Sequence, residues 1–238
     1  MKKIWVRMMV YPLGYLMWGG LMWYSQAITP LDLTNYLLKI PLCNSMFYNT
    51  LQSLPYNIIL FFKIIYVYAF TICIIGGIGY YLIVKRDFLK SDIILVDLVM
   101  GWFIAGLIYT IFVVKAPFQV GVAHDLVNER FMWIFTKPTY EIPSLHTAYS
   151  VLMALHFKNE PGSIKYIFYL LGVLIPISTL IMGQHWVVDV ITGILFAYFL
   201  YNLPKDIHLK IYNILNYLSG EFHIHSHHEN EVTESKKK

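Results

Sequence analysis

Two short polar motifs stand at the edges of apolar segments and carry residue types that suit phosphate chemistry. The first is Pro143-Ser144-Leu145-His146-Thr147, and the second contains Ser178, Thr179, His185 and Asp189. An unpaired polar group is costly to bury in hydrocarbon, so His and Asp are rare within membrane segments and are often functional there. Two histidines, an aspartate and nearby hydroxyls suit the transfer of phosphate through a histidine.

The spacing of His185 and Asp189 indicates how such a site would work. If the chain is helical from Trp186 onward, these residues share a face at the first helical turn. An aspartate that accepts a hydrogen bond from one imidazole nitrogen fixes the tautomer and leaves the other nitrogen as a nucleophile. The helix N-terminus favours a bound phosphate. His146 follows a Pro-Ser turn and could protonate a leaving oxygen. The alternative, that each histidine merely satisfies an interfacial hydrogen bond, explains the pair of motifs less well.

Composition indicates a polytopic membrane protein. The chain has 238 residues, of which 58% are hydrophobic, 17% are aromatic and only 13% are charged, against about 25% charged in soluble domains. The net charge of +4 lies in loops and in the tail. No basic stripe interleaved with aromatic residues is present, so we expect no nucleic-acid partner. Cys43 and Cys73 show no metal-ligand spacing and imply no disulfide framework.

A spanning helix needs about 20 mostly apolar residues. Six segments qualify or nearly do so, and they predict an all-α bundle of six transmembrane helices: 8–27, 57–83, 93–114, 145–157, 164–183 and 186–203. We expect a single membrane-embedded domain over 1–220, with an amphipathic stretch near 208–218, and a disordered polar tail over 221–238.

Loop charges predict the orientation by the positive-inside rule. Basic residues cluster at the N-terminus, in the loops after the second and fourth segments, and in the tail, so all four regions are expected in the cytoplasm. His146 and His185 then lie together on the outer side, and the bacterial inner membrane is the expected location. Alternatively, the first segment is a signal peptide with Ser25-Gln26-Ala27 as its cleavage site, which leaves the orientation unchanged.

The two motifs resemble those of the type 2 phosphatidic acid phosphatase and haloperoxidase superfamily. That superfamily uses Pro-Ser-x-His and Ser-x6-His-x3-Asp, and Pro143, Ser144, His146, Ser178, His185 and Asp189 stand at the matching positions. The resemblance covers roughly 93–203. It implies His185 as the phosphate-accepting nucleophile, Asp189 as its orienting partner and His146 as acid and then base.

The chain departs from the superfamily pattern where phosphate would be held. Leu145 replaces the usual Gly, and Thr179 replaces the usual Arg. With Gln184, Trp186 and Gly193, these departures are similar to the branch that contains inositol phosphorylceramide synthases and related bacterial phosphatases.

Other groups must therefore bind the phosphate. The basic candidates are Lys115 first, because it precedes Pro117 at the end of the third segment, and then Lys137 and Arg130. The hydroxyls of Ser144, Ser178 and Thr179 are the uncharged candidates.

The sequence thus predicts a membrane enzyme that cleaves a lipid phosphomonoester or pyrophosphate on the outer side, through a phosphohistidine. The expected partners are the bilayer and the phosphorylated lipid, and these residues require no metal or other cofactor. One rival is a phosphotransferase that passes the head group to an alcohol instead of water. Another is a transporter, which would spread polar residues over several broken helices, whereas here they concentrate at one end.

Overall fold

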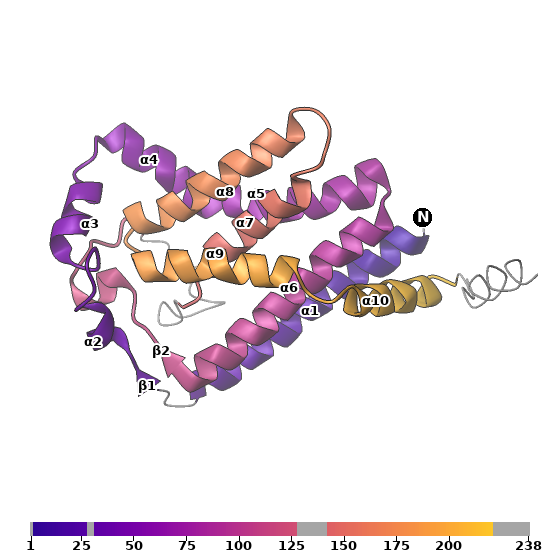
Figure 1. The fold of residues 1–238 in the computed structure, drawn as a ribbon, viewed down its shortest axis with the longest axis horizontal. Coiled ribbons are helices and arrows are strands. Elements are labelled where there is room, and N and C mark those ends of the chain that lie inside the picture. Colours follow the sequence, from indigo (N-terminus) through magenta and orange to yellow (C-terminus); the bar gives the residue numbers. More distant parts are fainter. Residues whose placement is uncertain (1, 28–30, 128–141, 221–238) are drawn as a thin grey trace, which may run out of the picture.

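The structure is a computed structural model that describes residues 2–27, 31–127 and 142–220, and its described part is mostly helical (Figure 1). Arg130, Lys137 and the predicted tail lie outside these residues. The elements are α1 (Lys2–Ala27), β1 (Leu31–Asp32), α2 (Thr34–Leu37), α3 (Ser45–Gln52), α4 (Tyr56–Ile64), the π-helical η1 (Ile65–Ala69), α5 (Phe70–Gly79), the π-helical η2 (Tyr80–Lys85), α6 (Phe88–Ile111), β2 (Phe112–Val113), the 3₁₀ turn η3 (Pro117–Val120), α7 (Leu145–Phe157), α8 (Ile164–Ile181), α9 (Val187–Tyr201) and α10 (Lys205–Leu218).

Each of the six segments predicted to span is helical, but the count of six spans is not confirmed. In the described part, three continuous helices are long and apolar enough to cross a membrane. They cover 56–85, 88–111 and 164–181, with mean hydropathies of 2.5, 2.1 and 1.9. A fourth span results if α9 and α10, which bend by 67° at their junction, are taken as one.

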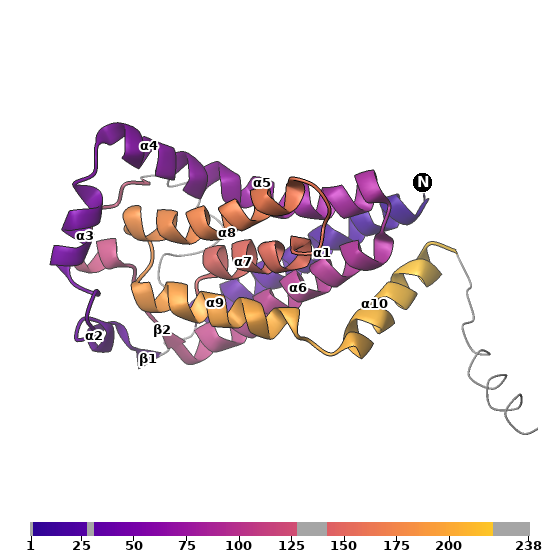
Figure 2. The ribbon, with the colours of Figure 1, turned by 45° about the horizontal axis from the view of Figure 1, so that its top comes forward.

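The short helix α7 explains part of the difference between the six predicted spans and the three or four that the structure supports. Its 13 residues rise only about 20 Å, which is less than the ~30 Å hydrocarbon core. Helices α5, α6, α8 and α9 pack around it (Figure 2), so its sides contact protein. A helix surrounded by protein does not have to match the thickness of the bilayer.

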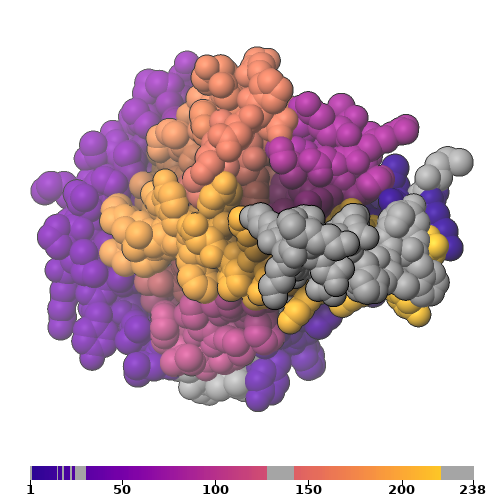
Figure 3. All heavy atoms as spheres, turned by 45° about the vertical axis from the view of Figure 1, so that its right-hand side comes forward, coloured from indigo at the N-terminus to yellow at the C-terminus, as the bar shows by residue number. Residues whose placement is uncertain are grey.

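The outward sides of the surrounding helices are apolar. Leu170 and Val173 on α8, and Ile191 and Leu195 on α9, each expose more than half of their area. Figure 3 shows parts of both helices, in orange and yellow-orange, at the surface. Such sides are compatible with a lipid environment.

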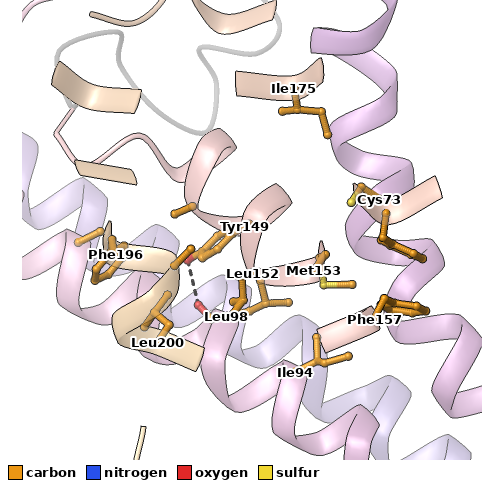
Figure 4. Packing of buried hydrophobic residues seen from close by; sticks show 14 of the residues in the cluster. Cys73, Ile94, Leu98, Tyr149, Leu152, Met153, Phe157, Ile175, Phe196 and Leu200 are labelled. Carbon is orange, nitrogen blue, oxygen red and sulfur yellow. Dashed lines mark hydrogen bonds between the residues drawn. The ribbon is translucent and has the colours of Figure 1, made fainter. Parts of the chain in front are cut away.

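Side chains from α7 also form the centre of the core. Tyr149, Leu152 and Met153 are buried against α6 and α5, and the Tyr149 hydroxyl donates to the Leu98 carbonyl at 2.9 Å (Figure 4). Gly77 on α5 makes this packing possible, because a Cβ there would lie 1.8 Å from the Met153 methyl. Small residues let membrane helices approach closely in this way.

Helices α1 and α6 run parallel with a regular register. Residue 7 contacts 92, residue 14 contacts 99 and residue 21 contacts 106, so the contacts recur every seven residues. Two of these contacts involve Gly14 and Gly106, where an added Cβ would lie 2.8 Å from Val99 and 2.4 Å from Leu21. A seven-residue contact repeat is typical of coiled-coil packing.

A two-residue strand pair follows from this parallel arrangement and departs from the purely helical prediction. β1 and β2 pair in parallel, with Leu31 opposite Phe112 and Asp32 opposite Val113. Since α1 and α6 run in the same direction, the chain leaves both helices side by side and can form parallel backbone hydrogen bonds. Pairing between segments so far apart in sequence leaves no local signal.

A buried ion pair fixes the other end of α1. Arg7 donates to both carboxylate oxygens of Asp92, at 2.7 and 2.5 Å, and both side chains are fully buried. Arg7 also donates to the Asn216 side chain at 3.1 Å, which links α1, α6 and α10. Removal of one partner of a buried pair leaves an uncompensated charge.

Arg7→Ala is expected to lower the free energy of unfolding by about 3–5 kcal/mol, because Asp92 stays buried without its counter-charge. Thermal unfolding of the purified protein in detergent measures the effect. Lys210→Ala removes an exposed positive charge from α10 and serves as the control, with little expected change. The double variant Arg7→Met/Asp92→Leu should recover much of the loss. A stability of Arg7→Ala equal to that of the control would contradict this account.

Candidate active site

His185 and Asp189 are positioned by the tight turn between α8 and α9. Gly183 makes this turn with φ of 71°, where a Cβ would lie 2.6 Å from the His124 carbonyl. His185 precedes α9 and lies in the turn, in agreement with the predicted helical segment that begins at residue 186. Its N–H donates to the Thr179 carbonyl at 3.3 Å, and its carbonyl accepts from the Tyr48 hydroxyl at 2.8 Å. The backbone of His185 is therefore held from two sides.

The Asp189 carboxylate contacts both the helix start and the histidine. Its Oδ2 accepts the Trp186 N–H at 2.7 Å and lies 3.5 Å from Nδ1 of His185. Asp189 is fully buried and His185 nearly so. The carboxylate thus caps α9 and faces one imidazole nitrogen, which is the position that the predicted orienting role requires.

His146 lies beside His185, with ring centroids 5.9 Å apart. Ser144 caps α7 and accepts from the Thr147 N–H at 3.3 Å, which places His146 in the first helical turn. The imidazole of His146 stacks on Tyr66 at 4.7 Å and contacts Phe70 at 4.2 Å. The two predicted catalytic histidines are therefore brought together, although they stand 39 positions apart in sequence.

The N-termini of α7 and α9 meet at this point. The Ser144 N–H donates to the Asp189 carbonyl at 3.2 Å. Gly193 permits the approach, since a Cβ there would lie 2.7 Å from the Ser144 carbonyl and 2.9 Å from Cβ of Thr147. Two helix N-termini side by side present backbone N–H groups and partial positive charge, which favour a phosphate.

The predicted hydroxyl ligands are buried beside the turn. Ser178 and Thr179 donate to the carbonyls of Ile175 and Pro176, at 2.6 and 2.7 Å, within α8. The Thr147 hydroxyl, which the sequence analysis did not assign, is buried and hydrogen-bonds to none of the described residues. A buried hydroxyl without a partner can serve a ligand, so Thr147 joins Ser144, Ser178 and Thr179 as a candidate.

Lys115 lies near the site but is paired with another residue. Its ammonium is 3.2 Å from the Asp32 carboxylate, and its carbonyl accepts the Trp186 indole N–H at 2.8 Å. Burial alone would raise the pKa of Asp32, but hydrogen bonds from Thr34 and Lys115 outweigh it and lower that pKa. Both charged side chains are roughly half exposed, and such pairs contribute little to stability. Asp32 therefore holds Lys115 only loosely.

The segment with the other basic candidates begins and ends beside the site. Val127 packs in a cluster with Tyr66, Ile181 and Met182, and Ile142 packs against the cluster that contains Trp186. Arg130 and Lys137 lie between these anchors, outside the described residues, so their roles stay predictions.

Several contacts that support the site had no signal in the sequence. Gln184 donates to Asp125 at 2.8 Å. Gln52 exchanges two hydrogen bonds of 2.8 Å with the backbone of His124. These contacts attach the chain before Val127, and helix α3, to the turn that carries His185. Polar residues in loops are common, so their spacing alone does not identify such contacts.

Cys43 lies against the first turn of α9, close to Asp189. Burial raises the pKa of its thiol, the Val188 and Val187 backbone N–H groups oppose the rise, and the Asp189 charge adds to it. The thiol is fully buried and free. A neutral buried thiol is a poor nucleophile, so His185 remains the better candidate. No set of three metal-ligating side chains with suitable geometry occurs within 2–27, 31–127 and 142–220.

Comparison with known proteins identifies the family. Residues 44–203 match the PAP2 superfamily, and this range holds both motifs and the helices α3 to α9. The chain belongs to the PAP2 superfamily. This PAP2 protein is 67% identical over 219 residues to a protein of Methanocaldococcus jannaschii described as "Uncharacterized protein MJ0662", with 92% of this chain and 91% of the relative covered. No solved structure matches. Membership indicates a phosphatase-type function, and the bacterial origin and the specific branch stay predictions.

Asp189→Asn in this PAP2 protein is expected to fold normally and to lose roughly 100-fold or more in turnover. The amide oxygen can still accept the Trp186 N–H, but the negative charge beside His185 is lost. Thermal unfolding and phosphate release, measured on the same preparation, separate the two effects. Equal turnover by Asp189→Asn and the wild type would exclude a charge-dependent role for Asp189.

Lys115→Ala is expected to reduce turnover by roughly 100-fold, because Thr179 carries no charge where the superfamily has Arg. Lys115→Arg should retain part of the rate, and Asp32→Asn, which frees the ammonium, should not lower it. Steady-state phosphate release measures all three variants, with Lys39→Ala as an exposed control. If Lys115→Ala turns over normally and Lys137→Ala is inactive, the phosphate ligand lies in the Arg130–Lys137 segment instead.

Proposed function

We propose that this PAP2 protein hydrolyses a lipid phosphomonoester or pyrophosphate on the non-cytoplasmic side of a membrane, through a phosphohistidine. The main support is the pairing of His146 and His185, 5.9 Å apart between ring centroids, with Asp189 beside Nδ1 of His185. The site lies at helix ends within a bundle in which three of the described helices are long and apolar enough to cross a membrane. A lipid substrate can reach such a site from the bilayer.

In the first step, Nε2 of His185 attacks phosphorus, and the bond from phosphorus to the lipid oxygen breaks. Protonated His146 donates its proton to that oxygen, so the lipid leaves as a neutral alcohol. Asp189 holds Nδ1–H of His185 and stabilises the positive charge that develops on the ring. The N-terminal N–H groups of α7 and α9 stabilise the charge on the phosphate oxygens.

In the second step, His146, now neutral, removes a proton from water. The water oxygen attacks phosphorus, the bond from phosphorus to Nε2 breaks, and inorganic phosphate leaves. Both histidines return to their starting states, and the steps require no metal ion. An alcohol in place of water would give a head-group transfer, so the product distinguishes the phosphatase from the phosphotransferase.

His185→Ala is expected to abolish turnover while the protein still folds, because the nucleophile is lost. Purified protein is assayed against a panel of lipid phosphates and pyrophosphates, and free phosphate and head-group transfer are followed together. His124→Ala, at an exposed histidine beside the site, is the matched control and should stay active. Undiminished lipid turnover by His185→Ala would exclude the proposed nucleophile.

The predicted orientation can be tested separately in intact cells. Met46→Cys places an exposed thiol on α3 at the histidine end, and Ser163→Cys places one at the start of α8, at the other end. With Cys43 and Cys73 replaced by alanine, an impermeant thiol reagent should label only position 46. Labelling of position 163 alone would place the histidines in the cytoplasm.

A further inference from the structure

A second polar site lies at the end of the bundle opposite to His146 and His185. A cavity of about 600 Å³ opens where α7 and α9 end and where α6 and α10 begin. His156 on α7 lines it and follows His146 by ten residues, which corresponds to about 15 Å along the helix. The cavity is therefore separate from the candidate active site.

The wall of this cavity offers cations and hydrogen-bond donors. The cations are Lys90 and Lys205, His156 and His208 add imidazole nitrogens, and no carboxylate is among the lining residues. Ile93, Ile94 and Leu203 add an apolar side. A wall with positive and apolar parts fits an anion that carries an organic group.

Two buried carboxylates hold polar side chains of this wall. Asp97 is fully buried and accepts from Nε2 of His156 at 2.9 Å and of His208 at 2.7 Å. Nδ1 of neither ring hydrogen-bonds to a described residue, so each ring, when protonated, has a second N–H that can donate to an anion. Glu160, also buried, accepts from Lys90 at 2.7 Å. These carboxylates fix the cavity-lining side chains in place.

The partial charges of the helix ends at the cavity nearly cancel. The side chains therefore determine which charge the cavity favours in a ligand. The C-termini of α7 and α9 contribute partial negative charge, and the N-termini of α6 and α10 contribute partial positive charge. Asp87 caps α6, whereas the Pro204 N-cap of α10 provides no side-chain cap. The Ile207 N–H donates to the Pro204 carbonyl at 3.1 Å, so the backbone N–H groups of Lys205 and Asp206 are the ones that a ligand could use, although the Asp206 side chain is exposed there.

We propose that this cavity binds a phosphate monoester, with Lys205, the α10 N-terminus, Lys90 and the two histidines as its ligands. The proposal does not depend on the proposed function, since no residue of the active site takes part. Its location at helix ends suits the head group of a lipid, and the same groups could bind a soluble phosphate monoester. The test separates these two sources.

The test measures binding to the full chain purified in detergent, in a His185→Ala background so that turnover cannot consume the probe. A short-chain phosphatidic acid and glycerol phosphate are titrated by calorimetry, with short-chain phosphatidylcholine as the negative control. Lys205→Glu should weaken binding of the phosphate monoester by about tenfold or more, because it reverses a charge at the cavity. Lys210→Glu, exposed on the same helix and not lining the cavity, should bind like its parent.

Each binding result either supports the proposal or overturns it. Binding of phosphatidic acid without competition from glycerol phosphate assigns a lipid head group, and equal binding of both assigns the phosphate monoester alone. The proposal is overturned if neither probe binds, if Lys205→Glu binds both as the parent does, or if Lys210→Glu loses as much affinity. Thermal unfolding checks that Lys205→Glu stays folded, as expected for an exposed side chain.

Discussion

Asp189 connects the two segments that carry the histidines, and the geometry of the candidate site depends on it. Its carboxylate caps α9 through the Trp186 N–H and approaches His185. Its carbonyl accepts the Ser144 N–H, which belongs to the segment that carries His146. Because one residue makes these contacts, the N-termini of α7 and α9 and both imidazoles have a fixed relative position. Gly193 leaves the space that this contact requires.

The buried position of α7 follows from the same constraint. For His146 to meet His185, the start of α7 must lie against α9, within the bundle and away from lipid. A helix in that position can be short, and α7 has 13 residues. Three of the four helices around it belong to longer helices that are apolar enough to cross a membrane, as lipid contact requires. The division into long outer helices and a short inner one is thus a consequence of where the histidines must be.

Much of the fold could be predicted from sequence because its signals are local. The apolar runs predicted the helices of all six segments, and the motifs predicted the superfamily. The parallel contact of α1 with α6, the pairing of β1 with β2, and the stacking of Tyr66 on His146 had no such signal, because each joins residues far apart in the chain. The short length of the fourth segment allowed either an extension through the Pro143 motif or a position lined by protein, and the contacts of α7 with α5, α6, α8 and α9 favour the second.

The site was predictable to a similar extent. The spacing of His185 and Asp189 predicted their proximity, because four positions near a helix start are a local relation. The partner of Lys115 was not predictable, since Asp32 reaches it through the β1–β2 pairing. Thr147 stood within the first motif, yet only its burial without a partner marks it as a candidate ligand. A pattern identifies residues that can do chemistry, and packing decides which of them have their hydrogen bonds already used.

The aspartate–histidine contacts at the two ends of the bundle differ in a way that suits different tasks. Asp189 uses one carboxylate oxygen for the Trp186 N–H and His185, and the ring of a second histidine, His146, lies 5.9 Å from that of His185 between centroids. Asp97 instead binds one histidine with each oxygen. The first arrangement places two imidazoles beside each other, as the proposed nucleophile and acid require. The second holds both rings to one carboxylate. This fixes the rings as part of a binding surface, and they do not lie on opposite sides of a reacting group.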